Sequence, residues 1–523
     1  MCGIICGSSY RDLAPLLLDG LRRLEYRGYD SAGIAVVDRE GAVRRMRSAG
    51  KVARLSETLE QNPISGTTGV AHTRWATHGP PETRNAHPHL SGDNLAVVHN
   101  GIIENFSQLR EMLEEQGFEF TSDTDTEVIA HLVNHYMNIR GDLFEAVNSA
   151  VGRLEGAFTF AAVHSQFPER LVVARQGTPL VLGVGENEAF AASDTYALLP
   201  LVSRFVFMED GDIADIQRDA IRIFDIEGNR ADRREEELTH HTDPADKGNY
   251  RHYMRKEIDE QAEVVEKAFR GWIRDGRLSD ASLPQQAQTA IAETEAVELI
   301  ACGTSHHAAM VAQYWLEEFG IPCRVEIASE HRYRKHPSAS GTLLVTISQS
   351  GETADTLAAL RHARRRPHAG AFSICNVPSS TLVRESDFSI QTHAGPEIGV
   401  ASTKAFTTQL AALRVLTLTL ANRHGLLPKE AEWRCIAELE AVTSVITPLL
   451  EQDGKFMEIA RGLEKSAHAL FLGRGSQYPI AKEGALKLKE VSYIHAEAYP
   501  GGELKHGPLA LVDSEMPVIC TLP

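Results

Sequence analysis

Residues 296–305 read Ala-Val-Glu-Leu-Ile-Ala-Cys-Gly-Thr-Ser, an apolar strand that runs into a glycine turn. The predicted helix Ala308 to Phe319 follows directly. A second unit comes soon after, with the strand Thr342 to Ile347, the turn 348–353 and the helix Ala354 to Arg364. Strand, turn and helix in this order are typical of a parallel, doubly wound α/β sheet.

The turn 348–353 (Ser-Gln-Ser-Gly-Glu-Thr) places hydroxyls and backbone N–H groups at the start of a predicted helix. A helix N-terminus has unpaired amides and a partial positive charge, so the turn could hold a phosphate. It is neither a Walker loop nor a G-x-G-x-x-G fingerprint. An ordinary N-cap is the commoner origin of such a turn, and the turn alone does not decide between the two.

The same pattern recurs later in the chain. Residues 467–472 form an apolar strand, 473–476 a glycine turn and Ile480 to Val491 a helix, offset by 171 residues from the strand and turn around Ser305. The first copy runs for more than 120 residues, whereas the second begins near Ala460 in a sequence of 523 residues. We therefore expect two related lobes, the second incomplete and ending in a strand at an open sheet edge.

The second predicted helix carries charged residues on one face. Glu483, Lys487 and Glu490 are spaced four and three apart, and His506 follows in a glycine-rich loop. A carboxylate, an amine and an imidazole beside a sugar phosphate could move a proton between adjacent carbons. A salt-bridged helix face has the same spacing, and spacing alone favours it.

The first 230 residues or so are richer in strands, such as Gly33 to Val37, Leu95 to Val98 and Phe158 to Val163. The apolar spacing predicts two helices among them, Leu13 to Leu24 and Asp125 to Met137. This order suits an α/β sandwich better than a doubly wound sheet.

Cys2 follows the initiator methionine, and a small residue there usually means that the methionine is removed. The terminal amine, with an ordinary pKa of about 7.7 to 8.0, could then accept the proton of the Cys2 thiol. A buried structural cysteine is the alternative.

The composition indicates an enzyme of a reducing, cytoplasmic compartment. The seven cysteines show neither metal-ligand spacing nor a disulfide framework, and the net charge of -18 disfavours a nucleic-acid partner. We find no targeting segment, and the most apolar stretch, Leu410 to Ala421, is interrupted by Arg414 and too short to span a membrane.

Between Asp232 and Asp259 the sequence is polar and charged, and we expect a linker that is a solvated loop without a partner. The predicted domains are 2–240, a linker and helix over 241–285, a first α/β lobe over 286–430 and an incomplete second lobe over 455–523.

Several motifs carry a resemblance to known families. Residues 2–4 (Cys-Gly-Ile), 26–33, 72–79 and 99–105 resemble a class II, N-terminal-nucleophile glutamine amidotransferase domain, which is an αββα sandwich. Residues 302–305, 348–353, 399–404 and 502–508 resemble paired sugar isomerase (SIS) domains. In this order the chain is similar to the glutamine:fructose-6-phosphate amidotransferase family.

For the first domain, the resemblance implies that Cys2 attacks the γ-carboxamide of L-glutamine and that Asn100 with the Gly101 amide forms the oxyanion hole. Arg74 would bind the α-carboxylate and Asp125 the α-ammonium of glutamine. Trp75 would act as a gate, and Thr77 and His78 would line the pocket.

For the SIS domains, the resemblance implies fructose 6-phosphate as the acceptor of ammonia and glucosamine 6-phosphate as the product. Glu490 would move the proton between the first two carbons, Lys487 would assist, and His506 would open the sugar ring from across a homodimer interface. No metal or organic cofactor is implied. The implied phosphate ligands are Ser348, Gln349, Ser350 and Thr353, with Thr304, Ser305 and Ser402 nearby.

The family's Schiff-base lysine lies in a C-terminal segment that this sequence lacks, so we expect glutaminase activity and weak or absent transfer. Two alternatives remain open. Another glutamine amidotransferase, such as a phosphoribosyltransferase or asparagine synthetase, would share the first domain but should show a pyrophosphate- or ATP-binding loop. A non-catalytic sugar-phosphate sensor would not need Cys2.

Overall fold

The computed structural model describes residues 2–237, 247–280, 283–337 and 339–522. The chain divides into two compact units, Met1–Ala245 and Asp246–Pro523, each of which is described by itself. Part of the expected linker, residues 238–246, and Met1 lie outside the described residues. No helix in the described ranges combines the length and apolar character needed to cross a membrane.

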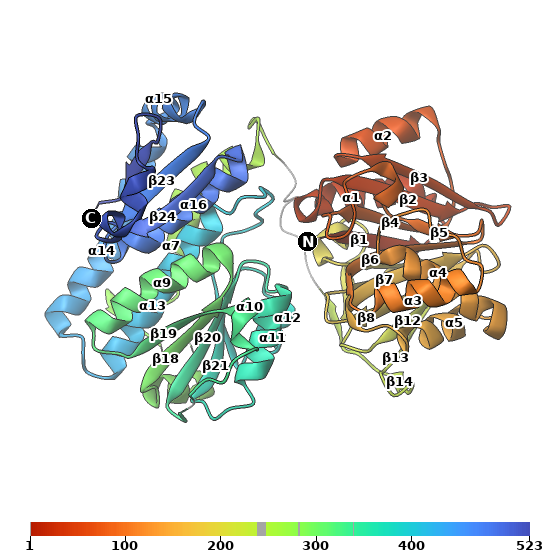
Figure 1. The fold of residues 1–523 in the computed structure, drawn as a ribbon. Coiled ribbons are helices and arrows are strands. Elements are labelled where there is room, and N and C mark those ends of the chain that lie inside the picture. The colour runs from red at the N-terminus through yellow and green to blue at the C-terminus, as the bar shows by residue number, and fades with distance from the viewer. Residues whose placement is uncertain (1, 238–246, 281–282, 338, 523) are drawn as a thin grey trace. The chain divides into compact units, whose positions relative to one another are not determined.

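Unit 1 is a sandwich of two mainly antiparallel sheets with helices on both outer faces (Figure 1). The first sheet has the order β15 (Glu235–Glu237), β11 (Arg204–Phe207), β9 (Val181–Val184), β10 (Ala189–Ala192), β1 (Gly3–Ser8), β4 (Thr68–Arg74), β2 (Ser31–Val37) and β3 (Val43–Ala49). The second has the order β14 (Arg230–Ala231), β13 (Ala220–Phe224), β12 (Ile213–Gln217), β8 (Arg170–Gln176), β7 (Gly156–His164), β6 (Leu95–Ile103) and β5 (His89–Ser91).

Alternation along β1 explains the layers of unit 1. Ile4 and Cys6 point into the core between the two sheets, whereas Ile5 packs on the opposite face against a helix. The first sheet is covered by α1 (Leu13–Leu24), α2 (Val52–Gln61) and α6 (Thr195–Leu198), and the second by α3 (Phe106–Glu115), α4 (Thr126–Arg140) and α5 (Leu143–Val151). The sequence-based prediction of an αββα sandwich is confirmed.

Unit 2 contains a parallel five-stranded sheet, ordered β19 (Cys323–Ile327), β18 (Ala296–Ala301), β20 (Thr342–Ser348), β21 (Gly370–Cys375) and β22 (Phe388–Gln391). One face packs on α7 (Tyr253–Arg270), α8 (Gln285–Ala292), α9 (Gly303–Glu318), α13 (Lys404–Arg423) and α14 (Lys429–Leu450). The other face packs on α10 (Ala328–His331), α11 (Ala354–Ala363) and α12 (Thr381–Arg384), so the sheet is doubly wound as predicted.

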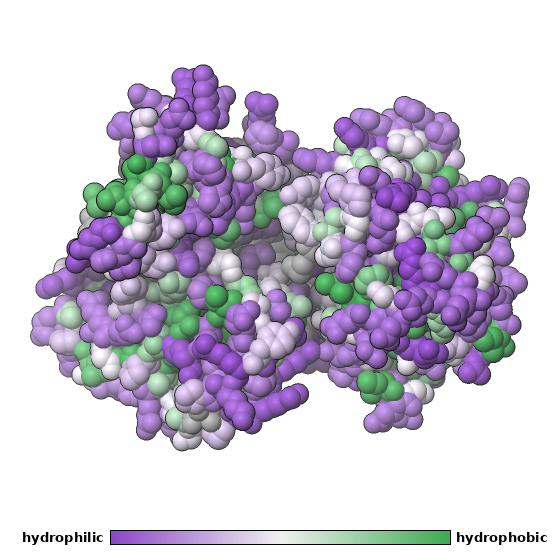
Figure 2. All heavy atoms as spheres, viewed as in Figure 1, coloured by the Kyte–Doolittle hydropathy of each residue, from purple (hydrophilic) through white to green (hydrophobic). Residues whose placement is uncertain are grey.

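The second lobe of unit 2 is a parallel three-stranded sheet, ordered β24 (His495–Pro500), β23 (His468–Gly473) and β25 (Val518–Cys520). Helix α15 (Asp453–Leu463) precedes it, and α16 (Gln477–Ser492) packs on the sheet and against α9 of the first lobe. Figure 2 shows a mainly hydrophilic surface with hydrophobic side chains gathered on this lobe, where Leu509, Leu511 and Val518 are exposed.

Two local predictions are wrong. Residues 233–237 are not a partnerless loop, because β15 pairs with β11 and Arg233 forms ion pairs with Glu209 and Asp212. The first helix of the α/β lobe begins at Gly303 and not at Ala308, since its first turn closes directly after β18. In addition, a hairpin of β16 (Ile273–Arg274) and β17 (Arg277–Leu278) precedes the first lobe.

Candidate active site

Cys2 directly precedes β1, and its half-buried thiol lies against the backbone that follows β4. The Trp75 N–H donates to Cys2 Sγ at 3.2 Å, and the Trp75 carbonyl oxygen lies 3.5 Å from the same sulfur. Burial raises the pKa of the Cys2 thiol, and the Trp75 N–H only partly opposes this shift. The resting group is therefore a thiol that must lose its proton when it attacks.

Asn100 and Gly101 stand near the end of β6, in the sheet opposite β1. Asn100 is 6% exposed, and its Nδ2 donates to the Cys2 carbonyl oxygen at 3.2 Å. Gly101 has φ +127°, and a Cβ there would lie 2.0 Å from the Ala157 carbonyl oxygen, so this position requires glycine. The structure therefore brings the predicted oxyanion-hole residues beside Cys2.

Arg74 organises the segment that was expected to line the glutamine pocket. Its buried guanidinium donates to the carbonyl oxygens of His78, Gly79 at 3.1 Å and Pro80 at 3.2 Å. The Asp30 carboxylate lies 3.9 Å from Arg74 Nη1. Three hydrogen bonds of the guanidinium group thus hold this turn.

Three predicted pocket residues lie around this turn with different exposure. The Trp75 side chain is 44% exposed and meets the edge of the Tyr29 ring at 5.4 Å between centroids. Thr77 is exposed, whereas His78 is half-buried with its ring against Phe106. These positions are compatible with a rim that a substrate passes, and the gate role of Trp75 stays a prediction.

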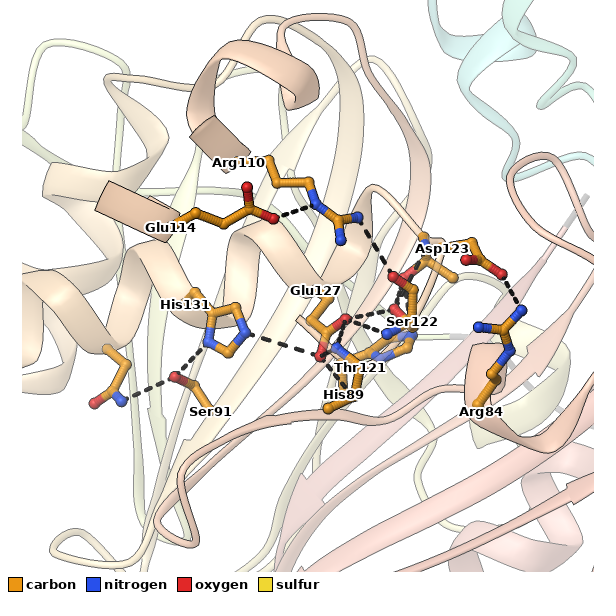
Figure 3. Close-up of polar contacts among 12 residues, drawn as sticks. Arg84, His89, Ser91, Arg110, Glu114, Thr121, Ser122, Asp123, Glu127 and His131 are labelled. Atoms are coloured by element: carbon orange, nitrogen blue, oxygen red, sulfur yellow. Dashed lines mark hydrogen bonds and ion pairs between the residues drawn. The ribbon is translucent and has the colours of Figure 1, made fainter. Parts of the chain in front are cut away.

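Asp125 lies close to β6, at the end of a loop that a buried network around Glu127 holds in place (Figure 3 shows Glu127 with Thr121 and Ser122). Its Oδ2 accepts the Ile103 N–H at 2.9 Å. Two residues on, the buried Glu127 carboxylate accepts the N–H and hydroxyl groups of both Thr121 and Ser122 at 2.7 to 3.1 Å. These bonds fix the loop 121–125 and with it the direction of the Asp125 side chain.

The rim of this network adds further support to the loop. Arg110 Nη1 donates to the Ser122 carbonyl oxygen at 3.4 Å, and Arg84 forms an ion pair with Asp123 at 2.7 Å. His89 Nε2 lies 3.1 Å from Thr124 Oγ1 (Figure 3 labels His89, Arg84 and Arg110). Reasoning from the sequence missed Glu127, because an acidic residue in the first turn of a helix is unremarkable by pattern.

In unit 2 the predicted phosphate turn has the expected shape. Ser348 ends β20, its Oγ accepts the Gly351 N–H at 3.0 Å, and it lies 3.1 Å from Thr353 Oγ1. Thr353 is the N-cap residue of α11, and Gln349 and Ser350 are half-buried between them. The hydroxyls and the helix N-terminus meet at one end of the sheet, as an anion site needs.

Thr304 and Ser305 lie in the first turn of α9, at the carboxyl end of the neighbouring strand β18. Ser402 lies before α13, and its hydroxyl donates to Glu397 Oε2 at 2.8 Å. Glu397 Oε1 also accepts the Thr403 N–H at 2.8 Å. The structure thus fixes the Ser402 segment internally, and a contact of Ser402 with phosphate stays a prediction.

The charged face of α16 is centred on Glu483. This carboxylate is 5% exposed and accepts hydrogen bonds from Thr304 Oγ1 at 2.9 Å and His307 Nδ1 at 2.7 Å, both from α9. Lys487 Nζ lies 3.4 Å from Glu483 and donates to Thr304 Oγ1 at 3.3 Å. Lys487 also pairs with the more exposed Glu490. The helix face is therefore salt-bridged, and it also joins the two lobes.

His506 is exposed, on a short 3₁₀ helix (Glu503–His506) and not in an irregular loop. Among the described residues, no hydrogen bond or ion pair joins it to Lys487 or Glu490. The structure therefore brings Lys487 and Glu490 together and leaves His506 apart from them.

A cluster with metal-ligand chemistry lies elsewhere in unit 2. Glu298, His331 and His336 have ligand atoms within 4.8 Å of one another. The two imidazole rings are stacked at 4.1 Å with 14° between their planes, so their lone pairs do not converge on one point. Arg366 Nη2 lies 3.2 Å from both Glu298 Oε2 and His331 Nε2. Burial would raise the pKa of Glu298, but His331 and the guanidinium groups of Arg324 and Arg366 lower it to about 2. This cluster is a buried ion-pair network.

Besides a pocket of about 400 Å³ beside β9, β11 and β13 of unit 1, two cavities lie away from all the predicted residues. One of about 850 Å³ in unit 1 is lined by Tyr10, Phe167 and Arg170 among others, and its Arg170 is held by Asp142 and Asp215. The other, of about 300 Å³, is an apolar groove between α7, α9, α13 and α14 in unit 2. Because neither contains a nucleophile beside an oxyanion donor, the site around Cys2 is the better candidate.

Comparisons with known proteins agree with this geometry. Residues 72–200 match the glutamine amidotransferase domain family, and residues 290–419 and 462–521 match the SIS domain family. The chain is 53% identical over 524 residues to the glutamine--fructose-6-phosphate aminotransferases [isomerizing] of Idiomarina loihiensis and of Escherichia coli K12. Each alignment covers 100% of this chain and 86% of the relative.

Among solved structures, the C-terminal domain of a glucosamine-fructose-6-phosphate aminotransferase from Francisella tularensis is similar to this chain. It has 50% sequence identity and a TM-score of 0.52, over 53% of this chain and 77% of that chain.

Proposed function

The chain belongs to the glutamine--fructose-6-phosphate aminotransferase [isomerizing] family, and we propose on this premise which of its residues perform the reaction. The reaction is glutamine-dependent amination of fructose 6-phosphate with isomerisation, which gives glucosamine 6-phosphate and glutamate. The observation that carries the proposal is that Asn100 Nδ2 donates to the Cys2 carbonyl oxygen at 3.2 Å, which places the Asn100 carboxamide beside the residue that bears the thiol.

In the first half-reaction the Cys2 sulfur attacks the γ-carboxamide carbon of glutamine and the C–S bond forms. The carbonyl oxygen becomes an oxyanion, which Asn100 Nδ2 and the Gly101 N–H stabilise. The C–N bond then breaks as the leaving NH₂ group takes the proton that the base accepted from the thiol and departs as ammonia. Water then hydrolyses the thioester to glutamate and the free thiol. Because burial raises the pKa of Cys2, a base must take the thiol proton, and the amine exposed by removal of Met1 is our candidate.

Recognition of glutamine falls to the charged groups on either side of this nucleophile. Arg74 offers its guanidinium group to the α-carboxylate, and the Asp125 carboxylate receives the α-ammonium. Thr77 and His78 line the pocket, and Trp75 covers it. The support for these roles is that Arg74 ends β4 directly before Trp75, whose N–H donates to Cys2 Sγ, and that Asp125 Oδ2 accepts the N–H of Ile103 in β6.

In the second half-reaction the turn 348–353 binds the phosphate of fructose 6-phosphate through Ser348, Gln349, Ser350 and Thr353. Ammonia adds to the sugar carbonyl, water leaves, and Glu490 moves a proton between the first two carbons with help from Lys487. His506 opens the sugar ring from a neighbouring subunit, which makes a homodimer part of the proposal. Thr304, Ser305 and Ser402 complete the sugar site.

We place this activity in the cytoplasm, without nucleic-acid or membrane partners. Seven free cysteines suit a reducing compartment, and the net charge of -18 works against binding to a polyanion. The two relatives named above cover the whole chain and share one name, which favours this reaction over the phosphoribosyltransferase, asparagine synthetase and sensor alternatives.

The test uses the full chain with Cys2→Ala, and with Cys6→Ala as the matched control. Burial raises the pKa of Cys6 to about 12, so its thiol should be inert. We expect a diazoketone analogue of glutamine to form one covalent adduct at Cys2, and glutamate release to disappear only in Cys2→Ala. Glutamate release by Cys2→Ala at the rate of the unmodified chain would overturn the proposal. Glucosamine 6-phosphate is measured in the same reaction.

A further inference from the structure

His72 lies on β4 of the first sheet and reaches across the sandwich to the oxyanion-hole residue of the second sheet. Its Nε2 is 3.0 Å from Asn100 Oδ1, and both side chains are buried. On the other side of the same carboxamide, Asn100 Nδ2 donates to the Cys2 carbonyl oxygen at 3.2 Å. The carboxamide is therefore held at both ends, by His72 and by the nucleophile residue.

The protonation state of His72 decides which way the Asn100 carboxamide faces. Burial, together with the neighbouring His99, lowers the pKa of His72 to about 3, so the ring is neutral and has one N–H. The Cys2 carbonyl oxygen can only accept, so the Asn100 NH₂ group faces Cys2 and Asn100 Oδ1 faces His72 Nε2. The proton therefore belongs on Nε2, where Asn100 Oδ1 accepts it.

We propose that His72 is a positioning residue of the glutaminase reaction, whose Nε2–H holds Asn100 Oδ1 so that Asn100 Nδ2 faces the oxyanion. The inference rests on the proposed role of Asn100. A 180° turn of the carboxamide would set its NH₂ group against the His72 N–H, so that two donors would face each other. The same turn would move the NH₂ group away from the Cys2 carbonyl oxygen. His72 thus selects the productive orientation.

The surroundings of His72 leave its ring little freedom. In the sheet, His72 is opposite Ile4 on one side and Gly33 on the other. Its ring is stacked on that of His87 with 4.0 Å between centroids. His87 Nδ1 in turn accepts the His99 N–H at 3.3 Å. A ring fixed on its strand and its face can orient a partner without touching the substrate.

The experiment measures kcat and KM for glutamate release by the full chain. His72→Leu should lower kcat on the order of 10- to 100-fold, which is less than the loss expected when the Asn100 donor is removed, with KM changed by less than about threefold. His72→Gln should restore most of kcat, because its amide N–H can donate to Asn100 Oδ1. His164→Leu is the control: this histidine is equally buried in unit 1, touches neither residue, and should stay within about twofold.

A double variant separates positioning from packing. In an Asn100→Ala background there is no carboxamide to orient, so adding His72→Leu should lower kcat by less than about twofold. A full additional loss there, or no loss in His72→Leu alone, would overturn the inference. Failure of His72→Gln to restore kcat would do the same. Glutamate release by Cys2→Ala would instead contradict the proposed function, which the same assay reports separately.

Discussion

Replacing Glu127 by glutamine keeps the size of the side chain and removes half of its acceptors. In the structure Oε1 accepts the N–H and hydroxyl of Thr121 at 2.9 and 2.7 Å, and Oε2 those of Ser122 at 2.7 Å each. In the variant one of these oxygens becomes an NH₂ group, so the two donors that this oxygen accepted would face another donor. Each hydrogen bond to a buried carboxylate contributes about 1.5 to 3 kcal/mol to stability. Because a hydroxyl can rotate towards another acceptor, we expect the free energy of unfolding of this loop to fall by about 3 kcal/mol and not by the full sum.

Hydrogen exchange measures this loss where it occurs. In peptides spanning residues 121–131, about 3 kcal/mol corresponds to amide exchange that is roughly 100-fold faster or more. KM for glutamine should rise in the same variant, because Asp125 lies in the loop that Glu127 holds. Peptides of unit 2 provide the internal reference.

Glu114→Gln is the matched control, from the same helix-and-loop region (Figure 3). Its carboxylate pairs with Arg110 at 2.9 Å but is half-exposed, so the change should cost less than about 1 kcal/mol. If Glu127→Gln accelerated exchange by less than threefold, or no more than Glu114→Gln does, the argument from buried acceptors would be refuted.

Three further outcomes are expected. Asn100→Ala should lower kcat for glutamate release by about 10² to 10³ with a nearly constant KM, and an unchanged kcat would remove Asn100 from the oxyanion hole. Ser350→Ala should raise KM for fructose 6-phosphate by about tenfold while glutamate release without the sugar stays constant, because one hydrogen bond to a dianion is lost. The free energy of unfolding of unit 1 should fall as the pH falls from about 6.5 towards 3, by up to about 1.4 kcal/mol per pH unit for each histidine. The reason is that these histidines bind protons in the unfolded state but stay neutral when they are buried in the folded state. A urea midpoint that does not move between pH 7 and pH 5 would contradict this; the histidines concerned have a lowered pKa, to about 3 for His72 and in the same direction for His87, His89 and His99.

The sequence predicts an element well where local chemistry agrees with the final packing. Helix α1 has the predicted bounds Leu13–Leu24, because its apolar spacing matches its buried face and the Asp12 side chain caps the Ala14 N–H. The short strand β15 was predicted as a loop, since three glutamates in a row show no alternation. Its structure comes from pairing with β11, a contact that local pattern does not contain.

The residues of the candidate site also differ in how well the sequence predicts them. The chemistry of an N-terminal thiol predicts Cys2, the resemblance implies Asn100, and the structure places the two residues in contact. His72 contacts Asn100 only after the two sheets have packed, so residue type and spacing gave no signal for its proposed role. Glu127 binds the nearby Thr121 and Ser122, but an acidic residue in the first turn of a helix is unremarkable by pattern. His506 is the opposite case: the resemblance implies a role for it, but that role requires a second subunit.

The hydrogen bond between Thr304 and Glu483 joins the two related lobes of unit 2. One lobe supplies the hydroxyl and the other supplies the carboxylate and, through Lys487, the amine. The two related lobes therefore contribute different groups to one hydrogen-bonded cluster. Expressed as separate polypeptides, the two lobes would have to reassociate before this cluster could form.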